Sequence, residues 1–125
     1  MENRRQDYRH IFRPHERRQV QMSAAAAGTL RGELLDLSLG GVRVRLPGGA
    51  PPLKPQERCR VQLEVDSDQA LLFDAEVIHR EPDPEASCGL RFLPLVDVNA
   101  WELRERRLWK FLLEEQRRLR RQRNS

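Results

Sequence analysis

The residues with the clearest potential for chemistry lie in two short segments of the sequence. The first is an arginine-rich run near the amino terminus that contains Arg4, Arg5 and Arg9, and the second is the run Asp-Leu-Ser-Leu-Gly-Gly from Asp36 to Gly41. An arginine guanidinium can pair through two hydrogen bonds with a phosphate or with the edge of a guanine, and it can stack on a flat base. A carboxylate would repel phosphate but would accept hydrogen bonds from guanine N–H groups. Together the two segments indicate a nucleotide, and not a bare anion, as the ligand.

Both segments adjoin stretches with the pattern of short antiparallel strands. In the clearest stretch, Val42, Val44 and Leu46 alternate with Arg43 and Arg45, as expected for a strand with one buried face. Turn-forming residues separate the stretches, above all the proline- and glycine-rich loop that follows. This spacing predicts a mainly β fold, in the form of a small closed or nearly closed barrel. The six predicted strands cover residues 19–22, 29–37, 41–46, 58–65, 70–79 and 88–92.

Different patterns flank the predicted barrel. Residues 1–17 are rich in arginine and poor in apolar side chains, which predicts a flexible basic arm. From Val98 onward, tryptophan and leucine side chains recur with helical spacing, which predicts an amphipathic helix. Its arginine-rich end is expected to project into solvent or to meet a partner. The predicted division is therefore a ligand-clamping arm (1–17), a barrel (18–97) and a helix with a basic tail (98–125).

Composition limits the classes of function. The 125 residues suffice for one domain with a modest core, and a net charge of +4 with a pI near 9.8 favours anionic partners. The three histidines and two cysteines lack metal-ligand spacing, and Cys59 and Cys88 both fall on inward-facing strand positions. No nucleophile is accompanied by a base and an orienting group, so neither a metal site nor an enzyme is predicted. No secretory signal or membrane-spanning segment is evident, so a cytoplasmic location is expected.

The two motifs, their order and the strand and helix pattern around them resemble the PilZ family of cyclic di-GMP receptors. The family's arm motif, two arginines that flank three residues, matches Arg5 and Arg9, and its loop motif matches Asp36, Ser38 and Gly41. The resemblance extends over nearly the whole chain, through the last predicted strand to the closing helix. It implies a six-stranded antiparallel PilZ-like β-barrel with a flexible basic amino-terminal arm and a carboxyl-terminal amphipathic α-helix.

The resemblance also implies a role for each motif residue. Arg5 and Arg9 would hold phosphate oxygens and guanine edges, while Asp36 would accept from guanine N–H groups or hold an arm arginine in position. Ser38 would donate to a phosphate or a base, and Gly41 would let the ligand approach the backbone. The residues implicated in ligand binding are Arg4, Arg5, Arg9, Asp36, Ser38, Gly40 and Gly41, with His79 and Arg80 as alternative contacts late in the fifth predicted strand.

Two points about the clamp stay open at this stage. In the family, an arginine directly before the clamp, here Arg4, is associated with two intercalated cyclic di-GMP molecules, and we adopt that stoichiometry over a single molecule. Arg13 lies four residues after Arg9 and four before Arg17. A clamp shifted along the arm is therefore the alternative register.

The predicted function is that of a non-enzymatic receptor whose arm closes over cyclic di-GMP and so changes the surface shown to an unidentified effector protein. The alternatives are a PilZ-fold scaffold that binds another protein without ligand, and a nonspecific nucleic-acid-binding module. The strands carry no ladder of exposed aromatic residues for base stacking, which argues against nucleic acid. The closing helix is also a candidate surface for oligomer formation. The sequence does not choose among motility, exopolysaccharide or biofilm formation, pilus function and transcriptional control as the regulated process.

Overall fold

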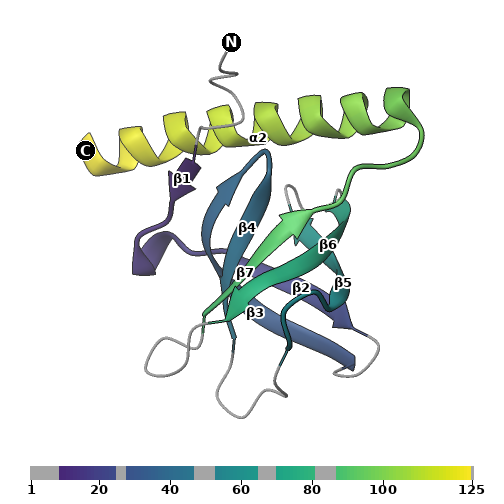
Figure 1. Cartoon of the computed structure of the whole chain (residues 1–125). Helices are drawn as coiled ribbons and strands as arrows, with labels where there is room; N and C mark the ends of the chain where they lie inside the picture. Colours follow the sequence, from purple (N-terminus) through teal and green to yellow (C-terminus); the bar gives the residue numbers. More distant parts are fainter. Residues whose placement is uncertain (1–8, 25–27, 47–52, 65–69, 81–86, 125) are drawn as a thin grey trace.

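The computed structural model describes residues 9–24, 28–46, 53–64, 70–80 and 87–124, which form a β-barrel with a long helix across it (Figure 1). The described elements are, in chain order, β1 (Arg9–Ile11), a 3₁₀ turn η1 (Pro14–Glu16), β2 (Gln19–Ala24), β3 (Gly28–Ser38), β4 (Gly41–Arg45), β5 (Arg58–Glu64), β6 (Ala70–Arg80), β7 (Ser87–Phe92) and helix α2 (Val98–Asn124).

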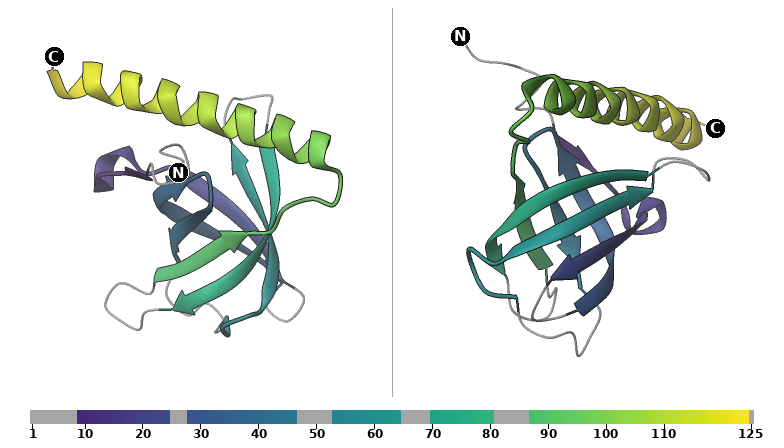
Figure 2. Two further views of the ribbon diagram at one scale, coloured as in Figure 1. Left: turned by 45° about the horizontal axis from the view of Figure 1, so that its top comes forward. Right: turned by 90° about the vertical axis from the view of Figure 1, so that its right-hand side faces the viewer.

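Strands β2 to β7 form the barrel. Hydrogen-bonded neighbours follow the order β3-β2-β5-β6-β7-β4, every pairing is antiparallel, and the pairing of β4 with β3 closes the ring. The right-hand view of Figure 2 shows the strands crossing the barrel beneath α2. The predicted six-stranded PilZ-like barrel is confirmed, and each strand begins and ends within two residues of its predicted bounds.

Alternating apolar residues of these strands fill the barrel. In β5, Cys59, Val61 and Leu63 are buried, whereas Arg58 and Arg60 are exposed. A fully buried side chain of this size stabilises the fold by about 1.5–3 kcal/mol relative to an exposed one. The alternation thus makes the inner face the main source of stability and leaves the outer face free for charged residues.

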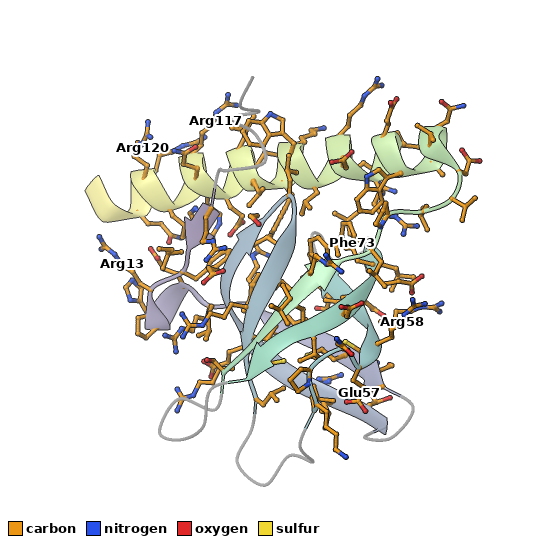
Figure 3. All side chains as sticks on the ribbon, viewed as in Figure 1. Arg13, Glu57, Arg58, Phe73, Arg117 and Arg120 are labelled. Atoms are coloured by element: carbon orange, nitrogen blue, oxygen red, sulfur yellow. The ribbon has the colours of Figure 1, made fainter. Side chains whose placement is uncertain are left out.

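Helix α2 covers the barrel with its apolar face. The helix begins at a cap in which Asp97 Oδ1 accepts hydrogen bonds from the N–H groups of Asn99 (3.0 Å) and Ala100 (3.1 Å). Near this end, Trp101 packs edge-on against Phe73 of β6, with ring centroids 6.2 Å apart, and Figure 3 shows Phe73 on the side of the barrel toward the helix. The predicted amphipathic helix is confirmed, and its apolar face is buried over most of its length. Its fully buried leucines are Leu108, Leu112 and Leu119.

The segment before β2 lies along one edge of β3. Strand β1 pairs with the carboxyl-terminal part of β3, and β2 pairs with its amino-terminal part, so both share that edge. Residues 9–11 were predicted to belong to the arm, and this strand was not predicted. Phe12, which follows β1, is buried, and its N–H donates to the carbonyl of Leu35. The carboxyl-terminal part of the predicted arm is therefore anchored to the barrel.

Candidate functional site

A β-bulge in β3 places Asp36 on the outer side of the barrel. The register between β3 and β4 shifts between Leu34 and Asp36. Because of this shift, Leu34 and Leu37 are both buried in the core, although residues three apart in a regular strand face opposite sides. Asp36 therefore lies opposite Arg43 of β4, outside the hydrophobic core.

Strand pairing aligns Asp36 with residues from four other strands. Asp36 is opposite Ile11 of β1 on one side and Arg43 of β4 on the other. Arg43 is in turn opposite Gly89 of β7, which is opposite His79 of β6. Since directly paired residues share a face of the sheet, these five positions form one row across the barrel. Gly89, the fourth position of the row, contributes no side chain.

Asp36 is only loosely paired with its arginines. Arg9 Nε lies 3.8 Å from Asp36 Oδ1, beyond hydrogen-bond distance, and the side chain of Arg9 is 60% exposed whereas that of Asp36 is 10% exposed. Burial raises the pKa of the Asp36 carboxyl, and the positive charges of Arg9 and Arg43 offset this effect only in part. A carboxylate in this state retains acceptor capacity for N–H groups that a ligand brings.

The end of the motif is a tight turn built on Ser38. Its Oγ accepts hydrogen bonds from the N–H groups of Gly40 (3.3 Å) and Gly41 (3.2 Å), a common turn pattern of serine. A Cβ on Gly41 would lie 2.2 Å from the carbonyl oxygen of Leu90 in β7, whereas a Cβ on Gly40 would meet no atom closer than 4.0 Å. The pairing of β4 with β7 thus requires glycine at position 41, independently of any ligand.

The sequence matches the model of the PilZ domain over residues 3–113. The chain belongs to the PilZ family. Among solved structures it is similar to the PilZ domain of YcgR from Escherichia coli, determined with c-di-GMP, at 24% identity, with a TM-score of 0.73 and with 94% of this chain and 95% of that chain covered.

Larger PilZ-containing chains are similar as well. YcgR from Escherichia coli in complex with c-di-GMP shares 26% identity, with a TM-score of 0.68, 94% of this chain and 48% of that chain covered, so this chain spans about half of its length. The inhibitor of motility MotI from Bacillus subtilis shares 17% identity, with a TM-score of 0.61, 80% of this chain and 46% of that chain covered. Among curated proteins, none matches significantly.

The PilZ fold brings five of the predicted ligand-binding residues together. Arg9 pairs directly with Ser38 across the β1–β3 ladder, and its guanidinium approaches Asp36. Gly41 begins β4 next to the same turn, and Gly40 is exposed within the turn. The two motifs that the sequence analysis singled out therefore meet at one place on the barrel.

The other predicted residues are placed less fully in this PilZ chain. Arg4 and Arg5 lie outside the described residues. The backbone positions of His79 and Arg80 are described: His79 lies in the row of Asp36, and Arg80 pairs with Cys88 one position further along. Of the two alternatives, the backbone register therefore aligns His79 with Asp36.

Two residues at the PilZ site were not predicted. Arg43 lies opposite Asp36, and its Nη2 donates to Ser87 Oγ at 3.3 Å. Ile11 also lies opposite Asp36 and is 67% exposed. The alternation of β4 indicated that Arg43 faces outward, but only the pairing with β3 shows which carboxylate it faces. For Ile11, the only signal was its place among the few apolar residues of a basic segment.

The remaining features lie away from this site. An open pocket of about 820 Å³ is lined by the carboxyl-terminal end of β2, the amino-terminal ends of β3 and β5, one residue of β6 and residues 93–94, and none of the motif residues lines it. Over the described ranges, no group of three or more His, Cys, Asp and Glu side chains could hold a metal ion. In the same part of the chain, no helix combines the length and the apolar character needed to cross a membrane. Cys59 and Cys88 are buried, as predicted.

Proposed function

We propose that the chain is a receptor for cyclic di-GMP. The observation that carries this proposal is the pairing of β1 with β3 in a PilZ fold, which sets Arg9 opposite Ser38 and 3.8 Å from Asp36. A PilZ domain with which the chain shares 24% identity was solved with c-di-GMP, which supports the same ligand here. Arg5 and Arg9 form the clamp, and the turn from Asp36 to Gly41 forms the opposing wall.

The chemistry of the exposed groups fits a guanine nucleotide. The guanidinium of Arg9 is mostly exposed and can leave Asp36 to pair with a phosphate or a guanine edge, each such charge-assisted bond contributing about 1.5–3 kcal/mol. Asp36 then accepts from guanine N–H groups, and the exposed side chain of Ile11 offers an apolar surface to a base. Arg4 adds a third guanidinium group, consistent with two intercalated ligand molecules. Gly40, Arg43, His79 and Arg80 complete the proposed wall.

Binding transmits a signal and involves no catalysis. The ligand changes the conformation of the arm and so the surface that an effector protein meets in the cytoplasm. Supporting this proposal, Arg9 belongs to β1, which pairs with β3, so a change at Arg9 acts on a segment that is packed on the barrel. One of the similar solved structures is an inhibitor of motility, which makes motility the first process to examine.

Calorimetry with the purified chain tests the proposal. Titration of cyclic di-GMP is expected to release heat with a ratio of two ligands per chain, and Arg5→Ala is expected to lose most of the affinity. No heat at tens of micromolar protein and ligand would overturn the proposal of a receptor and favour the alternative of a scaffold that binds another protein without ligand. A ratio of one ligand per chain would overturn the intercalated pair alone. Equal binding of any polyanion, with steep salt dependence, would instead indicate a nonspecific nucleic-acid-binding module.

A further inference from the structure

The outer face of α2 carries a row of cationic side chains that the nucleotide site does not use. The helix has nine lysine and arginine residues against four glutamates, a net charge of +5, whereas the whole chain has +4. We name five exposed cations of this row the basic stripe: Arg106, Lys110, Arg117, Arg120 and Arg121. Within the described part of the chain, none of these five side chains forms an ion pair.

Helical geometry places these residues along one side. Positions 106, 110, 117 and 121 are separated by four, seven and four residues, which are close to whole numbers of helical turns. At a rise of 1.5 Å per residue, the stripe extends about 22 Å from its first to its last residue. Figure 3 shows Arg117 and Arg120 on the side of α2 that faces away from the barrel. The members of the stripe therefore lie on one side of the helix and are open to a partner.

The opposite face of the helix holds the stripe in place. Glu115 is 3% exposed and is hydrogen-bonded through both oxygens by Arg18 from the barrel side and by Arg118 of the helix. Leu112 and Leu119, one turn to either side, are fully buried. A partner that binds the stripe thus meets an ordered helix and loses little affinity to ordering it.

The chemistry of the stripe selects among anionic partners. Glu102 and Glu114 are exposed on the same helix and lie close to the stripe, where a uniform array of phosphates would repel them. The apolar face, which a helix needs to insert into a membrane, is buried against the barrel. A second copy of the chain would bring a second basic stripe against the first. A predominantly acidic protein surface can set carboxylates against the cations and a lysine or arginine against each of these two glutamates, which a phosphate array cannot do.

We propose that the basic stripe is a docking surface for a protein partner that presents an acidic helix, with carboxylates spaced three and four residues apart. Such spacing places Asp or Glu side chains along one side of the partner at intervals that match the stripe. The surface lies on α2, and the nucleotide site lies on β1, β3 and β4, so the two can be occupied together. The proposal does not depend on nucleotide binding.

The test uses a fluorescent alanine-based helical peptide with glutamates along one face, and a peptide of the same composition with the glutamates spread around the helix. Affinity of the full chain for each peptide is measured by anisotropy without cyclic di-GMP. The stripe variant is Arg106→Gln/Lys110→Gln/Arg117→Gln. The matched control removes the same charge from exposed barrel positions and is Arg31→Gln/Arg45→Gln/Arg58→Gln. Thermal unfolding followed by circular dichroism establishes that both variants fold.

The expected result is preference for the patterned peptide, lost by about tenfold in the stripe variant and retained in the control, as three exposed ion pairs of about 0.5 kcal/mol each would give. Three results would overturn the proposal. The first is equal binding of both peptides, and the second is an equal loss in both variants, which would reduce the effect to net charge. The third is stronger binding to vesicles with anionic lipid or to duplex DNA, with the same dependence on the stripe.

Discussion

Two carboxylates in this molecule are each flanked by two arginines, and the two clusters differ in almost every physical respect. Glu115 lies beneath α2, and Arg18 and Arg118 each hold both of its oxygens, with three of the four hydrogen bonds between 3.0 and 3.1 Å. Asp36 lies on the barrel wall, where Arg9 approaches no closer than 3.8 Å and remains mostly exposed.

The pKa shifts of the two carboxyls have opposite signs. Burial alone would raise the pKa of Glu115, but the hydrogen bonds and charges of Arg118 and Arg18 outweigh burial and lower it. At Asp36, burial outweighs the charges of Arg9 and Arg43 and the pKa is raised. A carboxylate with all its acceptor sites filled stabilises the fold, whereas one with unfilled sites costs free energy until a ligand fills them. The comparison therefore separates a structural cluster from a candidate binding site.

The largest expected effect is on the structural cluster. Glu115→Ala leaves Arg18 and Arg118 without their shared acceptor, and we expect it to lower the free energy of unfolding by about 3 kcal/mol, as for other broken buried pairs. Chemical denaturation measures this loss. Glu114→Ala, an exposed neighbour, is the matched control and should change stability by no more than about 0.5 kcal/mol. Equal losses in both variants would mean that the cluster has no special role.

At the candidate site the same kind of change should act on binding instead. Arg9→Ala is expected to weaken cyclic di-GMP binding by about 10- to 150-fold, equivalent to about 1.5–3 kcal/mol, because a charge-assisted contact is lost. Its effect on stability should be small, because an exposed pair at 3.8 Å contributes little. Calorimetry on Arg9→Ala and on Arg13→Ala tests this. If Arg13→Ala loses as much affinity as Arg9→Ala, the clamp has the shifted register.

Removing the charge of Asp36 sharpens the contrast further. Asp36→Asn keeps the size of the side chain but replaces the ionised acceptor, so ligand affinity should fall by about tenfold. Stability at neutral pH should rise slightly, because the ionised form of Asp36 is disfavoured in the folded protein. Glu115→Gln should do the reverse, with lower stability and unchanged affinity. A loss of stability in both variants would contradict the assignment of Asp36 as a site poised for ligand.

The fold could be predicted from the sequence because its signals are local. Alternation along β4 and β5 and the helical spacing from Val98 each arise within one element, and a buried face requires them wherever the element packs. Strand β1 could not be predicted in this way. Its three residues contain a single buried side chain, His10, and the strand exists only because β3 extends beyond β2 and offers an unpaired edge.

The candidate site could be predicted only in part, because part of it depends on contacts between strands that are distant in the sequence. The loop motif identified Asp36 and Ser38, but the bulge at Leu35 that turns Asp36 outward has no signature in the sequence. The pairing that places Arg43 opposite Asp36 depends on how distant strands meet. Gly41 was assigned to ligand approach, and the structure adds a steric reason, the carbonyl of Leu90. Whether these residues contact a ligand stays a prediction.

The smallest expected effect is the pH dependence of the stability of Glu115→Gln and Asp36→Asn. The folded pKa of Glu115 is below its ordinary value of 4.5, so its stabilisation is complete above about pH 4.5 and is lost as the pH falls through the folded pKa. The folded pKa of Asp36 is above its ordinary value of 3.8, so its cost is absent below about pH 3.8 and grows as the pH rises through the folded pKa. Denaturation between acidic and neutral pH should therefore show Glu115→Gln less stable and Asp36→Asn more stable than the original chain at neutral pH, with both differences shrinking on acidification. Differences of the same sign at neutral pH would show that the two clusters are electrostatically alike.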